Sequence, residues 1–355
     1  MKAKFKALLN EIFIEGLSGM ATGLFATLIV GTILTQVGSL IPGIVGDYLF
    51  LIGKVASSVT GAGIGVGVAV RFKESPLVTI SAATCGMMGA FASKVIAGTV
   101  FVDGVIHYAG PGEPLGAFIA ALAGVYVGRA VSGKTKVDIL ITPLCCITAG
   151  SAVGLILGPP ISGFMAFLGN LINIGTQQQP FLMGILVSVL MGIILTLPIS
   201  SAALGVILNL SGLAAGAATV GCCANMVGFA VASYRENKVN GLLAQGLGTS
   251  MLQIGNIVKK PIIWLPAIIT SAILGPVSTC ILGMTNNATG SGMGTAGLVG
   301  QITTYQVMAT EGDGVIVLVK IIVLHFVLPA LLSLGISELM RKKGWIAEGD
   351  MKLNV

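Results

Sequence analysis

The stretch from Ile139 to Tyr234 contains no charged residue, and a second stretch, from Pro261 to Thr310, is also uncharged. Soluble proteins are charged at about a quarter of their positions, whereas this chain has 9% charged and 55% hydrophobic residues. At about 20 residues per crossing, the chain can cross a bilayer roughly ten times. The sequence therefore predicts an all-α polytopic membrane protein with about ten transmembrane helices.

Residues 275–301 form a polar, glycine-dense segment inside this apolar sequence. Thr285, Asn286 and Asn287 are followed by glycines at positions 290, 292, 294 and 297. Each glycine in a helix interior costs roughly 1 kcal/mol relative to alanine. Broken backbone at membrane depth is tolerated only where it is buried in protein or lines a water-filled cavity. We therefore expect a re-entrant hairpin whose tip offers amides and hydroxyls to a small polar solute.

An earlier segment repeats this pattern. Residues 198–205 align without gaps with residues 276–283, at an offset of 78 residues (276 − 198). The same offset pairs Asn209 with Asn287, Gly212 with Gly290, and Gly216 with Gly294. Interrupted segments in corresponding positions of two halves are the best sequence pointer to a transporter's binding site. A second re-entrant hairpin is therefore expected at about 198–218.

The uncharged polar residues and one glycine in and beside the two hairpins are the candidate substrate-binding residues. They are Thr285, Asn286, Asn287, Ser291, Gly292, Gln301, Ser200, Ser201, Asn209 and Asn225. Two interpretations stay open for Ser200 and Asn225, which either cap helix breaks or face the solute. Gln301 either bonds across helices or binds the ligand. Asn286 either binds the solute or caps the broken helix.

The charges between the apolar stretches predict the topology. Basic loops at 71–73 and 129–136 alternate with acidic loops at Asp47 and 103–113. The positive-inside rule therefore predicts a cytoplasmic N-terminus, and the basic residues 341–343 predict a cytoplasmic C-terminus. One expected crossing, at about 48–70, contains alternate glycines that favour close helix approach. Residues 160–179 are typical of a surface helix that links two halves.

Several functions are excluded by residue types and spacing. The six cysteines and two histidines lack the spacing of a metal site. Residues 128–135 match the phosphate-loop pattern, but they lie between two apolar spans and not between a strand and a helix. We therefore expect no metal, no cofactor and no enzymatic chemistry of the chain's own. The net charge of +6 indicates topology and contact with the lipid bilayer, not nucleic-acid binding.

With these motifs in hand, the chain resembles the membrane (IIC) subunits of the bacterial phosphotransferase system, glucose superfamily. Residues 286–301, from Asn-Asn-Ala-Thr-Gly-Ser-Gly to Val-Gly-Gln, are similar to a signature of the toxin-regulator branch. Sugar-transporting members carry Gly-Ile-Thr-Glu-Pro in the second hairpin, with a glutamate that binds sugar hydroxyls. The matching residues here are 283–287, so Asn286 stands at the glutamate position. Those members also use a histidine in the transport half, and here no histidine occurs between His107 and His325.

The resemblance implies a homodimeric, elevator-type transporter in a bacterial cell membrane. Residues 1–158 would form the scaffold and dimer contacts, 159–179 an interfacial linker helix, 180–340 the transport domain, and 341–355 a cytoplasmic tail. The expected solute is a sugar, a polyol or a sugar acid, and phosphorylation would need a separate soluble IIB protein. The alternative is a membrane sensor or regulator that keeps the fold without transport.

Overall fold

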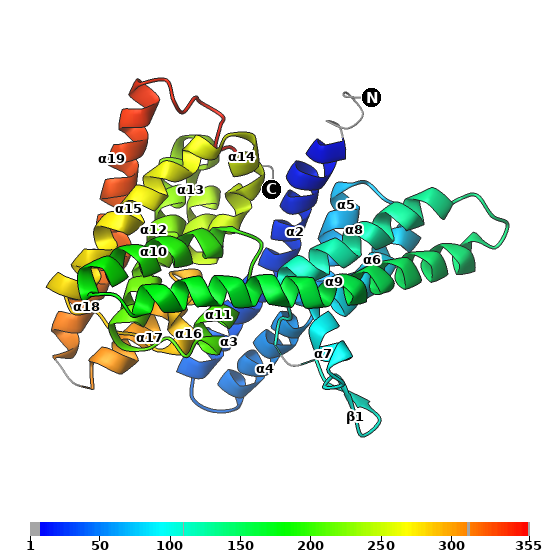
Figure 1. Cartoon of the computed structure of the whole chain (residues 1–355), viewed down its shortest axis with the longest axis horizontal. Coiled ribbons are helices and arrows are strands. Elements are labelled where there is room, and N and C mark those ends of the chain that lie inside the picture. The colour runs from blue at the N-terminus through cyan, green and yellow to red at the C-terminus, as the bar shows by residue number, and fades with distance from the viewer. Residues whose placement is uncertain (1–7, 109, 311–312, 354–355) are drawn as a thin grey trace. The chain divides into compact units, whose positions relative to one another are not determined.

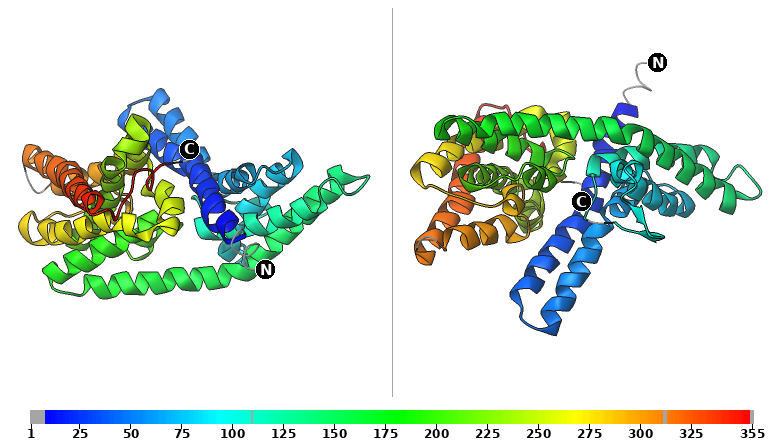
Figure 2. Two further views of the ribbon diagram at one scale, coloured as in Figure 1. Left: turned by 90° about the horizontal axis from the view of Figure 1, so that it is seen from above. Right: turned by 60° about the horizontal axis from the view of Figure 1, so that its bottom comes forward.

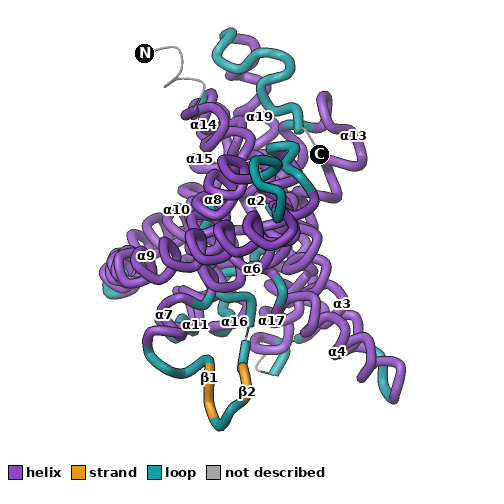
Figure 3. The backbone as a smooth tube through the Cα atoms, turned by 90° about the vertical axis from the view of Figure 1, so that its right-hand side faces the viewer, coloured by secondary structure: helices purple, strands orange, loops and turns teal. Residues whose placement is uncertain are grey.

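The computed structural model of the chain describes residues 8–108, 110–310 and 313–353 (Figure 1). The chain divides into two compact units, Met1–Phe164 and Met165–Val355. Helices make up most of the backbone, and the one small antiparallel hairpin among the described residues is formed by β1 (Phe101–Val102) and β2 (Val105–Ile106) (Figure 3). The predicted all-α membrane class is therefore confirmed.

The first unit is a bundle of helices. They are α2 (Leu17–Leu24), α3 (Val30–Leu40), α4 (Ile44–Ser58), α5 (Thr60–Arg71), α6 (Pro76–Ala90), α7 (Ala92–Ile96), α8 (Pro114–Val131) and the start of α9 (Asp138–Thr176). With two π-helical turns, α2 and α3 form one apolar helix, Leu8–Leu40. The helices α3 and α4 pair as a hairpin that projects from the rest of this unit, in blue in Figure 2.

Glycines bring the helices of the first unit into backbone contact. Side chains on Gly61 and Gly65 would collide with the backbone of α6, and side chains on Gly63 and Gly67 would collide with the backbone of α2. The close approach predicted from alternate glycines is confirmed, and α5 uses two of its faces for it. These glycines of α5 are thus occupied by contacts within one chain.

The number of long apolar helices is smaller than the roughly ten crossings expected. Among the described residues, six helices are long and apolar enough to span a membrane, or seven if the bent pair α4 and α5 counts as one span. That pair was predicted as a single crossing at 48–70, but the helix bends by 55° at Val59. The apolar helices Pro76–Ala90 and Pro180–Thr196 are shorter, with 15 and 17 residues.

The second unit is built around one buried helix. Its elements are the end of α9, α10 (Pro180–Thr196), α11 (Ser201–Ile207), α12 (Gly212–Ala232), α13 (Tyr234–Leu243), α14 (Ile254–Lys259), α15 (Leu265–Pro276), α16 (Ala288–Ser291), α17 (Val299–Met308), α18 (Gly314–Ile322) and α19 (Leu328–Lys342). Most residues of α12 are buried, and α10, α15 and α19 pack around it. The predicted surface helix at 160–179 is instead continuous with the preceding span, because α9 runs through Pro159 and Pro160.

Residues 343–353 form a segment that we call the C-terminal strap. It leaves α19 and returns over α13 and α14 (Figure 1). Ile346 and Met351 are buried with Phe229 and Ile263. The side chain of Asn237 donates to the Met351 carbonyl at 2.8 Å and accepts from the Leu353 N–H at 2.8 Å. These bonds hold the strap against the end of α12 where the helix meets α13.

Candidate functional site

Two broken segments interrupt the helices of the second unit. In the first, the break after α10 leads through the short helix α11 to α12; in the second, the break after Ile281 leads through α16 to α17. The long helix that follows each short one starts at Gly212 and at Val299, which are 87 residues apart (299 − 212). Paired interruptions are present, but the 78-residue register is wrong. It pairs Gly205, inside α11, with Gly283, which lies in a break at φ +57°.

The two broken segments meet through backbone groups. The Asn286 N–H donates to the Gly212 carbonyl at 3.3 Å, and the Ser201 hydroxyl donates to the Gly292 carbonyl at 2.6 Å. A side chain on Gly292 would collide with the backbone of Ser201, and a side chain on Gly205 would collide with the Ser291 hydroxyl. Short helices α11 and α16 therefore lie against each other as closely as glycine allows.

Asn286 joins three elements at this contact and is 1% exposed. Its Nδ2 donates to Thr219 Oγ1 on α12 at 2.8 Å and to the Gly300 carbonyl on α17 at 3.2 Å. Its Oδ1 accepts from the Asn287 N–H at 2.8 Å. Both ends of the amide are thus engaged by the protein itself. Thr219 was not among the predicted site residues, because nothing in the local sequence of α12 marks it.

Helix capping, which was left open for Asn286, belongs to its neighbour. Asn287 Oδ1 accepts from the Gly290 N–H at 3.0 Å and caps the start of α16. Ser291, at the end of the same short helix, is buried and donates to the Ala288 carbonyl at 2.9 Å. Thr285 is half-buried before the cap, with its N–H 3.5 Å from the Met308 sulfur.

Asn225 is the centre of a separate polar cluster between α10, α12 and α15. It is fully buried and accepts from Trp264 Nε1 at 2.9 Å and from the Thr196 hydroxyl at 3.3 Å. Its Nδ2 donates to Ser271 Oγ at 3.2 Å. Trp264 belongs to the short helical turn Pro261–Trp264 before α15. The Asn225 amide therefore joins this turn, α10, α12 and α15. Of the predicted residues that remain, Ser200 is buried beside α11, and Asn209 is exposed in the following turn at φ +46°.

Gln301 lies on α17, directly after the Gly300 carbonyl that Asn286 holds. Its Nε2 is 3.2 Å from His325 Nδ1 and 3.4 Å from the Cys223 sulfur. Three buried polar atoms in this part of the unit have no hydrogen-bond partner among the described residues: Gln301 Oε1, His325 Nε2 and Thr304 Oγ1. Thr304 is one helical turn after Gln301 and therefore lies on the same face of α17. His325 was not among the predicted site residues.

No group of three His, Cys, Asp or Glu side chains in the described residues could hold a metal ion. A family model described as "Phosphotransferase system, EIIC" matches residues 14–353. The match includes both units and both broken segments. No curated protein matches the chain.

Proposed function

Since the chain belongs to the phosphotransferase system EIIC family, we propose that its second unit carries a sugar, a polyol or a sugar acid across the membrane. EIIC proteins are membrane translocation subunits of sugar systems, and separate IIA and IIB proteins carry out phosphorylation. The protein is thus a multi-pass membrane subunit. We infer that both termini face the cytoplasm of a bacterial cell, where a separate IIB protein would meet it.

The observation that carries this proposal is the set of unpartnered polar atoms beside the second broken segment. A buried donor or acceptor without a partner costs about 1–3 kcal/mol. Gln301 Oε1, Thr304 Oγ1 and His325 Nε2 together therefore favour occupation by a polar molecule. An amide, a hydroxyl and an imidazole can each donate or accept, which suits the hydroxyls of a neutral polyhydroxy solute. The absence of charge from Pro261 to Thr310 supports a neutral solute over an ionic one.

The test is a thermal-shift screen of sugars, polyols and sugar acids, followed by calorimetry with the best ligand. Thr304→Val removes one unpartnered hydroxyl with little change in shape. We expect it to weaken binding about tenfold, or 1.4 kcal/mol. The matched control is Ser337→Ala, which removes a buried and unpartnered hydroxyl on another helix, α19. Equal affinity for wild type and Thr304→Val would place the solute elsewhere.

We propose an elevator movement in which the second unit moves and α9 supplies the hinge. Pro159 and Pro160 lie within α9 next to the division between the units. A proline in a helix removes a hydrogen bond and weakens the helix locally. Replacing both by alanine should slow uptake into proteoliposomes and leave the ligand Kd unchanged. Pro143→Ala, in the same helix but within the first unit, is the control and should transport normally.

The proposed homodimer needs an interface other than the glycines of α5. On α4, Tyr48, Leu51 and Val55 share one face and are 59%, 57% and 57% exposed. We propose that this face meets its copy in the bilayer. Val55→Cys should cross-link in a Cys280→Ser background, since Cys280 is exposed. Ile281→Cys in the second unit, which is 73% exposed, should not. The reverse result would overturn the assignment of the first unit as the dimer scaffold.

One observation favours a membrane sensor or regulator as the second candidate. At the position where the resembling transporters carry a sugar-binding glutamate, Asn286 uses its amide for contacts within the protein. A sensor would bind the solute without moving it. Uptake of the labelled ligand into proteoliposomes distinguishes the two, because a sensor would show saturable binding and no accumulation.

A further inference from the structure

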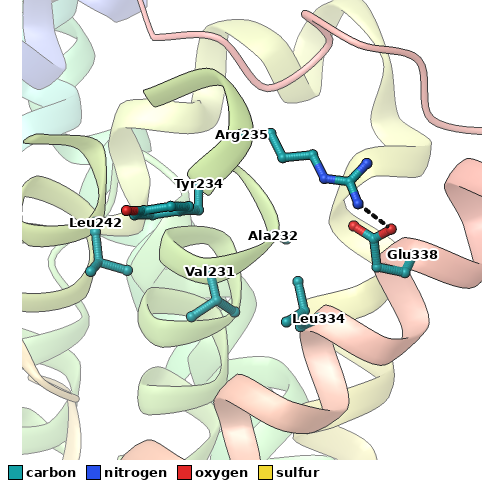
Figure 4. Close-up of a pocket in the computed structure, with 7 residues that line it drawn as sticks. All are labelled: Val231, Ala232, Tyr234, Arg235, Leu242, Leu334 and Glu338. Carbon is teal, nitrogen blue, oxygen red and sulfur yellow. Dashed lines mark hydrogen bonds and ion pairs between the residues drawn. The ribbon is translucent and has the colours of Figure 1, made fainter. Parts of the chain in front are cut away.

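A hollow of about 460 Å³ lies at one end of the second unit, between α12, α13 and α19. Its lining is drawn in Figure 4 and consists of Val231, Ala232, Tyr234, Arg235, Leu242, Leu334 and Glu338. Most of these side chains are apolar, and the only charged pair joins Arg235 Nη2 to Glu338 at 2.8 Å. The hollow thus combines an apolar floor with a cation at its rim.

The cation at the rim is accessible. The side chain of Arg235 is 64% exposed, and Glu338 engages one of its nitrogens. A guanidinium has five N–H donors, so Arg235 can bind a second acceptor without breaking this ion pair. The ammonium of Lys238 lies 6.0 Å from the centre of the Tyr234 ring, beside the same opening.

The hollow opens where the apolar surface of α19 ends. Leu331 and Leu334 are 62% and 40% exposed, and the helix finishes in the basic residues 341–343. Trp345 follows, 48% exposed, with the Lys343 ammonium 5.0 Å from its ring. Apolar, then basic and aromatic surface is the pattern of a membrane–water interface. The rim of the hollow therefore lies at the depth of lipid headgroups.

The charges around the rim favour an anion. Three nearby acids are paired, Glu338 with Arg235, Glu236 with Arg341 and Asp350 with Lys260. Among the described residues, three lysines near the rim form no ion pair: Lys238, Lys342 and Lys343. Glu348 is the one nearby acid without an ion pair in this part of the described chain, so positive charge is in excess. Basic pockets between membrane helices on the cytoplasmic side are typical binding sites for anionic headgroups.

We propose that this hollow binds an anionic phospholipid. The headgroup phosphate accepts hydrogen bonds from Arg235 and faces Lys238, while an acyl chain lies over Leu334, Leu242 and Val231. A volume of about 460 Å³ is within the usual range of small-molecule pockets and suits the headgroup with the first part of a chain. The bound lipid would tie α12, α13 and α19 together at the end that the C-terminal strap also covers.

The experiment is native mass spectrometry of the full chain in detergent, titrated with phosphatidylglycerol or with phosphatidylcholine of the same acyl chains. Wild type should bind the first phosphatidylglycerol at least tenfold more tightly than phosphatidylcholine, and added salt should reduce this preference. Arg235→Gln should abolish the preference, whereas Arg235→Lys should keep part of it. Arg71→Gln, which removes an arginine ion-paired to Glu15 at the end of α5 in the first unit, is the control and should bind like wild type.

Two further arms separate this lipid from other anions. Leu334→Gln should weaken phosphatidylglycerol binding, because it places an amide against the acyl chain. Glycerol phosphate, which lacks acyl chains, should not displace the lipid. Equal binding of the two lipids by wild type, or full phosphatidylglycerol binding by Arg235→Gln, would overturn the proposal.

Discussion

Both units bring helices into backbone contact at glycines, as Gly184 and Gly275 do for α10 and α15 in the second unit, but the units differ in the polar groups that join their helices. In the first unit, α5 contacts α2 and α6 through glycines, and ion pairs join Arg71 of α5 and Arg129 of α8 to acids near the helix ends. In the second unit, buried amides join the helices, with Asn225 and Asn286 each bonded to several segments. Backbone contact holds helices with little adjustment possible, whereas polar side chains can exchange partners with a ligand. This difference in polar groups is the one expected if, as proposed, the first unit is a scaffold and the second unit binds the solute.

The largest effect is expected where a side chain is added to the first unit. Gly65→Val would drive two methyl groups into the backbone of Ala82. We expect a loss of about 3 kcal/mol or more in the free energy of unfolding, seen as little folded protein in size-exclusion chromatography. Gly163→Val is the control, since nothing lies within 4 Å of a Cβ there. A stable Gly65→Val protein would contradict backbone contact as the basis of this unit.

A smaller loss is expected from the amide cluster of the second unit. Asn225→Leu leaves the Trp264 N–H and the Thr196 hydroxyl without their shared acceptor. We expect a loss of about 2 kcal/mol in the free energy of unfolding, with a change in tryptophan fluorescence. Asn240→Leu, at an exposed position of α13, should be nearly neutral. If both variants melt alike, the cluster does not join the helices.

At the contact of the two broken segments, the contributions of Asn286 and Asn287 to the free energy of unfolding can be compared directly. Asn286→Ala removes bonds to Thr219, Gly300 and Asn287 and should cost about 2 kcal/mol. Asn287→Ala removes the cap of α16 and should cost about 1 kcal/mol. Thermal unfolding of both variants shows which substitution costs more stability. If Asn286→Ala keeps full stability but loses ligand affinity, its amide serves the solute and not the fold.

The smallest effect concerns the strap at the end of the second unit. Burial raises the pKa of the Asp350 carboxyl, but the hydrogen bonds from Lys260 and Ala347 outweigh it, so the pKa lies below its ordinary value. The charged form is thus favoured in the folded state. The Asp350 carboxylate therefore stabilises the folded state above about pH 3.9, the ordinary pKa of the group. This stabilisation is lost as the pH falls through the lower pKa of the folded state.

Asp350→Asn should therefore lose about 0.5 kcal/mol at neutral pH and differ less from wild type below pH 3 or so. Chemical unfolding at both pH values measures the difference. Glu348→Gln, an exposed acid in the same strap, is the control. A difference between Asp350→Asn and wild type that is the same at both pH values would show that the ion pair does not hold the strap.

Local sequence was enough to locate the two broken segments of the second unit, because the cost of a broken helix is a property of the residues concerned. Pro198 follows the end of α10, and the glycines after Asn287 interrupt the second segment. The interruption after α10, where a hairpin was expected to begin at residue 198, was predicted on this basis. The register of the repeat was not, because glycines recur throughout the chain and matching them does not match backbone conformation.

From the residues alone it follows that this chain is a membrane protein and that the helices of its second unit are interrupted near residues 198 and 285. Only the tertiary structure decided which groups meet. Asn286 and Asn287 are neighbours of the same type, yet one joins three elements and the other caps α16. His325 faces Gln301, and the strap closes over α13 and α14. A hydrogen bond between elements depends on a partner distant in sequence, so the residue type limits what a side chain can bind, and the fold decides what it does bind.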